Sequence, residues 1–258
     1  WLRASTQRIT RRPRHQHPLF RTAIAATLCL GVGASWLLAT DGNPAPHTYI
    51  NSGLATQPQI LEDGSLVVLD AGSALTTRFG WRTRRVELQQ GRMQLRVAAA
   101  ARPMRVQAGN STLRDIGPPC PVELLDDGKV GVALLDGALD VASHGEQKMH
   151  RQLQPGEQLQ VQSSGLIEPS TPLSRQQAEA WLHGQLLFDG TPLSVAVAQM
   201  NRYTATPLVI ADPAIANLAV NGNFRAGDQA ALLSALELGW SIGGQPRADG
   251  ALELRSTL

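Results

Sequence analysis

Short segments between residues 49 and 162 alternate apolar and polar residues. A period of two directs apolar side chains to one face of a β-strand. Turn dipeptides such as Asp63-Gly64, Asp127-Gly128, Asp136-Gly137 and His144-Gly145 separate the segments. The alternating segments are 65–70, 86–89, 93–97, 104–108, 130–134 and 139–141. The fold class predicted for 49–162 is therefore all-β, a sandwich or a solenoid-like sheet, without a convincing amphipathic helix.

The periodicity changes after residue 162. The stretch 163–174 is rich in Ser, Thr and Pro and is predicted to be an interdomain linker. Thr191 and Pro192 form a helix-start signal in which the hydroxyl acts as the cap. An apolar stripe at helical spacing then follows, formed by Leu193, Val197, Met200 and Tyr203.

A second helix is predicted to begin at Asp228 as its cap and to end at Gly239. Its buried positions are predicted to be Leu232, Ala235 and Leu236. Strand candidates flank both helices, at 185–188, 208–210, 218–224, 240–242 and 252–254. The order β-α-β-β-α-β predicts a small α+β domain over 175–258, with both helices on one face of a sheet whose edges are exposed.

The N-terminal region has a different composition. Residues 23–40 carry no charge, and at about 1.5 Å per residue they cover roughly 27 Å as a helix, enough for a bilayer core. Residues 1–22 hold six Arg and no acid, which places them on the cytoplasmic side. We expect one transmembrane helix at 23–40, a linker at 41–48 and an exported remainder. The alternatives are a cleaved signal peptide and, less favoured, a buried core helix.

The charge balance gives little support for a nucleic-acid partner. The 258-residue chain has a net charge of +2, but all of the basic excess lies in residues 1–22, and the remainder holds 17 basic and 21 acidic residues. Cys29 and Cys120 lie in very different segments, so neither a structural disulfide nor a CxxC metal site is predicted. A lone cysteine such as Cys120 is usually a small core residue.

No arrangement of catalytic residues stands out. The chain lacks a Gly-rich phosphate loop, a Gly-x-Ser-x-Gly elbow and a His-Glu-x-x-His helix. The acid pairs 62–63 and 126–127 each precede Gly, which is typical of turns. His47, His144, His150 and His183 are scattered and are interpreted as surface residues. The sequence therefore predicts neither an enzyme nor a cofactor or metal site.

Several stretches in order resemble the FecR-type transmembrane anti-sigma regulators of Gram-negative bacteria. The stretch 61–73, with its Asp63-Gly64-Ser65 turn, looks like the signature of that family, and 85–91, ending in Gly91, is similar to its next strand. The stretches around Gly117, Gly137 and 153–157 match later turns of the family. In the last third, 181–184, 187–188, 192–193, 201–203 and 220–224 look like its C-terminal domain, which resembles the short N-terminal domain of secretins and TonB-dependent transducers.

The resemblance implies a fold and a function. It implies an inner-membrane protein with a cytoplasmic N-terminus and periplasmic domains, which relays an iron-siderophore signal from a TonB-dependent outer-membrane transducer to an extracytoplasmic-function sigma factor. Signalling would proceed by protein binding and regulated proteolysis. Two positions depart from the family pattern: Arg92 stands where Glu is usual, and Pro118 where Thr is usual.

A partner surface is predicted in the C-terminal domain. Its candidate residues are Trp181, Phe188, Leu193, Arg202, Tyr203 and Phe224, although Leu193, Tyr203 and Phe224 also fit a core role. The competing hypothesis is a membrane-anchored module that binds envelope glycan or peptide and has no sigma partner. In that case Arg78, Arg82, Arg84 and Arg85 would form a basic patch near Trp81.

Overall fold

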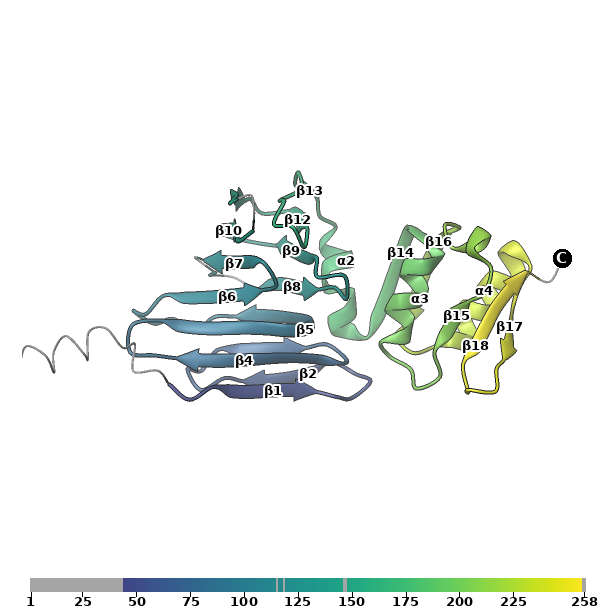
Figure 1. Cartoon of the computed structure of the whole chain (residues 1–258), viewed down its shortest axis with the longest axis horizontal. Coiled ribbons are helices and arrows are strands. Elements are labelled where there is room, and N and C mark those ends of the chain that lie inside the picture. The colour runs from purple at the N-terminus through teal and green to yellow at the C-terminus, as the bar shows by residue number, and fades with distance from the viewer. Residues whose placement is uncertain (1–43, 115, 118, 146–147, 257–258) are drawn as a thin grey trace, which may run out of the picture. The chain divides into compact units, whose positions relative to one another are not determined.

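The computed structural model describes residues 44–114, 116–117, 119–145 and 148–256 (Figure 1). By their internal contacts, residues 43–258 belong to one unit. Within the described residues, 47–172 contain thirteen strands and no helix, and we call this region the β part. Its strands are β1 (His47–Asn51), β2 (Gln57–Ile60), β3 (Leu66–Leu69), β4 (Ser73–Phe79), β5 (Arg84–Arg96), β6 (Met104–Ala108), β7 (Ser111–Arg114), β8 (Cys120–Leu124), β9 (Val130–Leu134), β10 (Leu139–Ser143), β11 (His150–Leu153), β12 (Glu157–Val161) and β13 (Thr171–Pro172).

One long strand, β5, joins two halves of a single curled sheet. The first half of β5 pairs with β4 and β6, in the order β1-β4-β5-β6-β7-β10-β11. The second half pairs with β3 and β8, in the order β2-β3-β5-β8-β9-β12-β13. The all-β prediction for this region is confirmed, but one continuous sheet replaces the separate sheets of a sandwich.

The joint between the two halves of the sheet lies at Gly91. Gln90 still pairs with Ala74 of β4, whereas Gly91 pairs with Leu124 of β8. Gly91 has a φ of +77°, and a Cβ built there would lie 2.9 Å from the Cα of Ser73. A side chain at this position would therefore be both strained and in collision with the neighbouring backbone.

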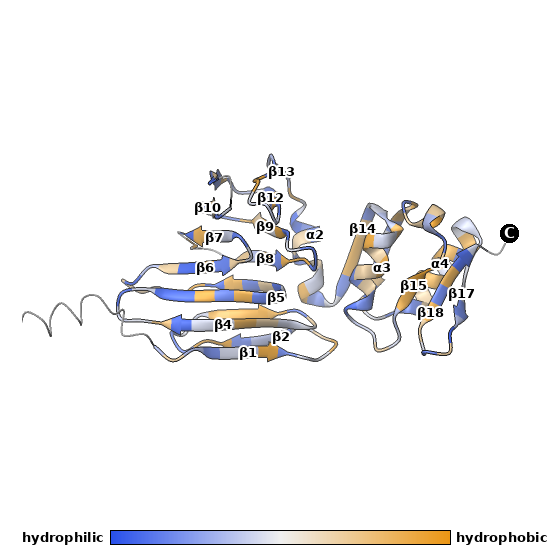
Figure 2. Cartoon of the chain, viewed as in Figure 1, coloured by the Kyte–Doolittle hydropathy of each residue, from blue (hydrophilic) through white to orange (hydrophobic). Residues whose placement is uncertain are grey.

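Both halves of the sheet face one hydrophobic core. The inward positions alternate with outward ones, and Figure 2 shows the resulting blue and orange bands along β5. Val86 and Leu88 from the first half and Met93 and Leu95 from the second half are almost fully buried in this one cluster. Cys120 also lies in the cluster, a position that the sequence did not determine.

Residues 175–256 form the second region, which we call the α+β part. Its strands make two separate sheets, the antiparallel pair β14-β16 and the three-stranded β15-β18-β17. Helices α3 and α4 alternate with these strands in the predicted order, but the single sheet that was predicted is wrong. The elements are α2 (Arg175–Ala180), the 3-10 helix η1 (Trp181–His183), β14 (Gln185–Pro192), α3 (Leu193–Asn201), β15 (Leu208–Ile210), the 3-10 helix η2 (Pro213–Ile215), β16 (Ala219–Arg225), α4 (Gln229–Trp240), β17 (Ile242–Pro246) and β18 (Leu252–Ser256).

The helix ends partly follow the sequence signals. Asp228 caps α4 by accepting a hydrogen bond from the backbone N–H of Ala231. The predicted stop at Gly239 is wrong, because α4 continues to Trp240 and Ser241 takes the left-handed conformation with a φ of +53°. Thr191 does not cap α3, since its Oγ1 accepts from the N–H of Asp189 in the preceding turn.

Three sequence predictions fall on residues that the structure does not describe. The transmembrane helix at 23–40 and the basic segment 1–22 lie outside the described residues, as does Pro118. Among the residues that are described, no helix has the length and apolar character to cross a membrane.

Candidate functional site

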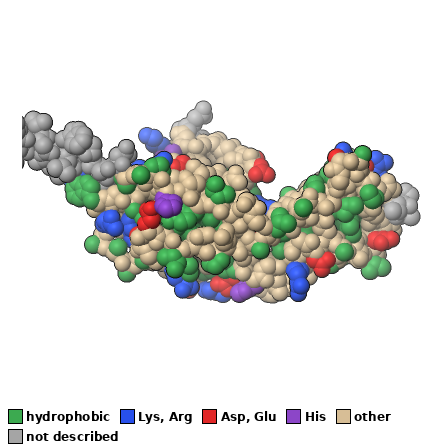
Figure 3. All heavy atoms as spheres, turned by 90° about the horizontal axis from the view of Figure 1, so that it is seen from below, with side chains coloured by type: hydrophobic (Ala, Val, Ile, Leu, Met, Phe, Trp, Pro, Cys, Tyr) green, Lys and Arg blue, Asp and Glu red, His purple; other side chains and the backbone are tan. Residues whose placement is uncertain are grey.

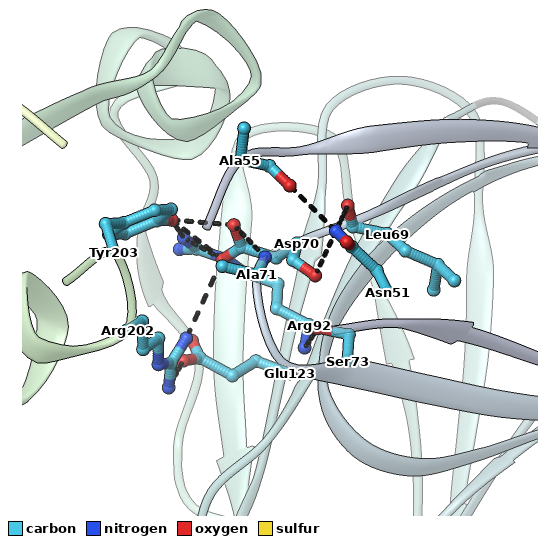
Figure 4. A network of polar contacts seen from close by, with 10 residues as sticks. All are labelled: Asn51, Ala55, Leu69, Asp70, Ala71, Ser73, Arg92, Glu123, Arg202 and Tyr203. Carbon is cyan, nitrogen blue, oxygen red and sulfur yellow. Dashed lines mark hydrogen bonds and ion pairs between the residues drawn. The ribbon is translucent and has the colours of Figure 1, made fainter. Parts of the chain in front are cut away.

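A buried carboxylate, Asp70, is the centre of a polar network between the β part and the α+β part (Figure 4). Asp70 directly follows β3, where the apolar run of that strand ends, and its side chain is fully buried. Its backbone is fixed on both sides: its N–H donates to the carbonyl of Arg92, and its carbonyl accepts from the side-chain amide of Asn51. The carboxylate is therefore held in place by the sheet itself.

Arg92 on β5 is the first partner of this carboxylate. Its Nε and Nη2 donate to Oδ2 of Asp70 at 2.9 and 2.6 Å. The backbone N–H of Arg92 donates to Oγ of Ser73. The residue that departs from the FecR pattern is thus tied to the sheet at its backbone and to Asp70 at its side chain.

Tyr203 brings the α+β part into the network. Its hydroxyl lies 2.7 and 2.8 Å from the two carboxylate oxygens of Asp70, and Nη2 of Arg92 donates to the same hydroxyl at 2.9 Å. Tyr203 follows α3, and its ring is buried in the core of the α+β part. A single phenol therefore belongs to one core while its hydroxyl is bonded in the other part.

Arg202 adds a second connection beside Tyr203. Its Nη2 lies 2.6 Å from Oε1 of Glu123 on β8, and its Nη1 lies 3.9 Å from Oδ2 of Asp70. Nη1 is buried and has no hydrogen-bond partner. The guanidinium is thus shared between two acids of the β part.

The ionisation of the network follows from its burial. Burial alone lowers the pKa of the Arg92 guanidinium, but attraction to Asp70 and Glu123 outweighs it, and the net pKa is raised. Burial raises the pKa of the Tyr203 phenol, with Arg92 opposing and Asp70 reinforcing the change. Arg92 therefore stays charged and Tyr203 stays protonated at neutral pH, so the phenol can donate to Asp70.

Trp181 packs against the same guanidinium. The Cζ of Arg92 lies 4.4 Å from the centroid of the indole ring. A groove of about 350 Å³ opens beside this pair, between β8, β9 and β12 on one side and α2 with the segment 168–173 on the other. Arg92, Glu123 and Trp181 all line it.

The arrangement is suited to holding two regions together. A shared carboxylate, two guanidinium groups and a phenol form charge-assisted hydrogen bonds, which are strong when water is excluded. Among the described residues, no group of three or more His, Cys, Asp or Glu is placed to hold a metal ion.

The six residues predicted for a partner surface divide into two groups. Trp181, Arg202 and Tyr203 lie at the contact with the β part. Phe188, Leu193 and Phe224 lie in the hydrophobic core of the α+β part, and the Phe188 and Phe224 rings are 5.7 Å apart. The contacts described for all six are internal to the chain, and their role toward a partner stays a prediction.

The motif residues of the β part have structural roles that the structure defines. Asp63 accepts from the N–H and hydroxyl of Ser65, and Gly64 between them has a φ of +82°. Oδ2 of Asp63 also binds Nη1 of Arg84 at 2.7 Å. Gly137 has a positive φ as well, at +79°, whereas Gly117 lies in an irregular segment without one.

One of the four arginines proposed for a basic patch near Trp81 is not on the surface. Arg84 is buried in its ion pair with Asp63, so it is not part of a surface. Arg82 lies over the Trp81 ring, with its Cζ 4.3 Å from the ring centroid. Arg78 pairs with Glu87.

Sequence reasoning missed Asp70, Glu123 and Asn51, and it treated Arg92 only as a departure from a pattern. Asp70 carries one readable signal, a lone acid at the end of the apolar run 66–69. Arg92 follows a glycine at the point where β5 changes its neighbours, a change that no local pattern shows. Arg92 and Tyr203 are separated by 111 positions in the sequence, so no local pattern predicts their contact.

Comparison with known proteins gives a family match and a fold match. Residues 51–140 match the family model described as FecR protein. Two crystal structures of "a putative anti-sigma factor from Parabacteroides distasonis ATCC 8503", at 1.65 and 2.50 Å resolution, share 23% sequence identity with this chain at a TM-score of 0.70. They align over 82% and 83% of this chain and over 100% of their own length, which shows a shared fold. No curated protein matches the chain.

Proposed function

This chain carries a FecR domain at residues 51–140, and from that premise we propose that it is an anti-sigma regulator which acts by protein binding and not by catalysis. The fold shared with a protein described as a putative anti-sigma factor supports the proposal. So do the ordered motifs that led to the same family from the sequence. The proposed partner inside the cell is an extracytoplasmic-function sigma factor.

One observation carries the proposal beyond the family match: the network of Asp70, Arg92, Arg202 and Tyr203 couples the FecR domain to the α+β part. A regulator without catalytic chemistry transmits a signal only by a change in association or arrangement. Buried charged contacts have few alternative arrangements, because each group left unpaired costs free energy. A partner that binds one arrangement of the α+β part more tightly than another would therefore act on the FecR domain as well.

The proposed location is the bacterial inner membrane. The uncharged run 23–40 would span the bilayer once, with the arginine-rich residues 1–22 in the cytoplasm and the remainder in the periplasm. A single span without intramembrane charge lacks the polar groups of a channel or carrier. Information would then cross by regulated proteolysis of the anchor or by a change in association.

The proposed periplasmic partner is the signalling domain of a TonB-dependent outer-membrane transducer that responds to an iron-siderophore. The α+β part offers edges for strand addition, since β14 and β16 each pair with only one strand among the described residues. An added strand gains affinity from main-chain hydrogen bonds along such an edge. This contact mode needs no exposed apolar surface.

A binding experiment on the full chain tests the proposal. The chain is reconstituted in nanodiscs and titrated with the transducer signalling domain, and amide hydrogen exchange maps the contact. We expect binding at micromolar concentration, with protection at β14 or β16. The outer strand β11 of the β part is the internal control, because it is also a sheet edge.

Two outcomes contradict the proposal. One is the absence of binding, and the other is protection confined to β11 or to the β1 and β2 edges. The sigma factor is tested separately, by co-purification with the full chain from membranes. Failure of both proteins to bind would favour the alternative, an anchored module for envelope glycan or peptide.

A further inference from the structure

Four arginines occupy directly paired positions on neighbouring strands of the β part. Arg78 on β4 pairs with Arg85 on β5, Arg85 pairs with Arg105 on β6, and Arg105 pairs with Arg114 on β7. Residues that are directly paired point to the same face of a sheet. With about 4.8 Å between strands, the row is roughly 15 Å long.

The row faces solvent. On β5 and β6 the neighbours of Arg85 and Arg105 are buried while the arginines themselves are exposed, and Arg114 is exposed as well. Figure 3 shows acidic and basic side chains dispersed over one face of the molecule. The row is identified from the strand register.

Two acidic residues lie beside the row: Glu87, on the same face of β5 as Arg85, and Asp140, at the Arg114 end. Arg78 binds Glu87 at 3.2 Å. Asp140 on β10 pairs in register with Arg114, although its carboxylate lies 3.3 Å from Nε2 of His150. No ion pair joins Arg85, Arg105 or Arg114 to another described residue. Like charges on directly paired positions destabilise a sheet, so the row has a cost that an anionic ligand would remove.

An exposed tryptophan lies at the same end of the sheet. The β4–β5 hairpin turns through residues 80–83, closed by the N–H of Gly80 donating to the carbonyl of Thr83. Trp81 in this turn is 50% exposed, and Arg82 stacks on its ring. Arg102, which precedes β6, stabilises the turn because its Nη1 donates to the Gly80 carbonyl at 2.6 Å. Exposed indole rings are enriched at membrane–water interfaces.

The chain enters the β part beside this hairpin. His47, the first residue of β1, pairs with Thr77, the neighbour of Arg78 (Figure 1). Thr40, the end of the uncharged run, precedes His47 by seven residues, which extend at most about 25 Å. If 23–40 spans a membrane, the hairpin end of the sheet cannot lie far from that membrane.

We propose that the row Arg78, Arg85, Arg105 and Arg114, together with Trp81, docks the β part on the anionic lipid headgroups of the membrane that holds the chain. This inference rests on the proposed membrane anchor. The phosphates of anionic lipids complement a row of guanidinium groups, which bind phosphate oxygens in a bidentate manner. The tether keeps those lipids within reach, whereas an acidic protein would have to be recruited from solution.

Hydrogen exchange of the full chain in nanodiscs tests the docking. Discs of phosphatidylcholine are compared with discs that contain phosphatidylglycerol. We expect exchange across 78–85 and 104–114 to be slowed severalfold in the anionic discs only. The slowing should disappear at about 0.5 M NaCl, because salt screens exposed charges.

A triple substitution, R85Q/R105Q/R114Q, should abolish the slowing. Each arginine near an anionic surface contributes about a fivefold factor, so three together remove about 100-fold of the docking equilibrium. The matched control is R225Q/R247Q/R255Q, which removes the same charge from exposed positions of the α+β part and should retain the slowing. Neither variant should unfold at a lower temperature than the parent chain, and the triple substitution in the row should unfold at the same or a slightly higher temperature, because it removes like charges from directly paired positions.

Flotation with phosphatidylcholine vesicles separates failure of the anchor from failure of the docking. A chain that floats but exchanges identically in both discs keeps its anchor and overturns the docking proposal. Loss of the slowing in the control variant also overturns it. A chain that does not float refutes the anchor, and its exchange with phosphatidylglycerol vesicles then decides the docking directly. Slowing by polyglutamate but not by lipid would assign the row to an acidic polypeptide instead and would equally refute lipid docking.

Discussion

Two buried ion pairs of similar chemistry occupy different regions of this molecule. Asp63 and Arg84 meet at 2.7 Å within the β part, and both side chains are 3% exposed. Asp70 and Arg92 meet at 2.6 Å at its border, with exposures of 0% and 14%. The two pairs differ in the groups that form their remaining contacts.

The first pair is satisfied locally. Arg84 donates to the backbone carbonyls of Arg102 and Ala98, so it fastens a neighbouring loop. The second pair extends to Tyr203 and, through the Arg92 guanidinium, to Trp181, both in the α+β part. The same pair of residue types therefore fixes a loop in one region and joins two regions in the other.

The largest effect is expected from Arg84→Met. Asp63 would remain buried without its guanidinium partner, and leaving one member of a buried pair typically costs about 3–5 kcal/mol. Urea denaturation of the chain measures this loss in the free energy of unfolding. The double variant D63N/R84M should recover part of it, and a double variant no more stable than R84M would show that the packing of the arginine stem matters more than its charge.

Arg92→Met should cost less, about 2–3 kcal/mol, because the Arg92 side chain is 14% exposed against 3% for Arg84, and because Arg202 remains 3.9 Å from Asp70 as a second cation. Its qualitative signature differs from that of the Arg84 variant. The β part and the α+β part should unfold in two separate transitions, and protease cleavage in 163–174 should become faster. A single shifted transition would mean that the network does not couple the two regions.

Tyr203→Phe removes only the hydroxyl and should cost about 1–2 kcal/mol. The matched control is Tyr49→Phe, which alters the other tyrosine of the chain, outside the network. In a double-mutant cycle with Asp70→Ala, which removes the acceptor, the Tyr203 change should show coupling and the Tyr49 change none. Additive effects of Tyr203→Phe and Asp70→Ala would contradict the hydrogen bond.

The smallest effect appears only at high pH. Burial raises the pKa of Tyr203 above its ordinary value near 10, so the unfolded chain loses this proton first. The stability that the phenol contributes is complete below about pH 10 and falls as the pH rises toward the folded pKa, by up to about 1.4 kcal/mol per unit. Across this pH range the free energy of unfolding should decrease less in Tyr203→Phe than in the parent chain. In the folded chain, the phenolate absorbance of Tyr203 should appear only at a pH above the ordinary tyrosine pKa near 10.

The sequence predicted those elements whose apolar positions have one clear period. The segments 104–108 and 130–134 alternate strictly and are strands with those bounds. Strand β4 was missed because its residues 73–77 are buried on both faces, which removes the alternation. Strands β2 and β11 were missed for the opposite reason, since edge strands bury few side chains.

The sequence pointed to the residues that the α+β part contributes to the candidate site, but not to their partners in the β part. Arg202, Tyr203 and Trp181 were singled out by residue type and by resemblance, whereas their partners Asp70, Arg92 and Glu123 carry no pattern that distinguishes them from surface charges. Pairing between distant segments depends on tertiary packing. The apolar period of a helix predicts that Tyr203 is buried but not that its hydroxyl extends into a second core.

The central place of β5 has a consequence for the order in which the chain acquires its structure. This strand hydrogen-bonds with β3 and β4, which precede it, and with β6 and β8, which follow it. Its last neighbour ends at Leu124, and Tyr203 comes much later still. Contacts of such long sequence separation form slowly, because the entropy of closing the loop is lost before the contact contributes favourable free energy. If the chain folds from its N-terminal end, the sheet is therefore expected to form before its connection to the α+β part, which makes that connection the last step of folding.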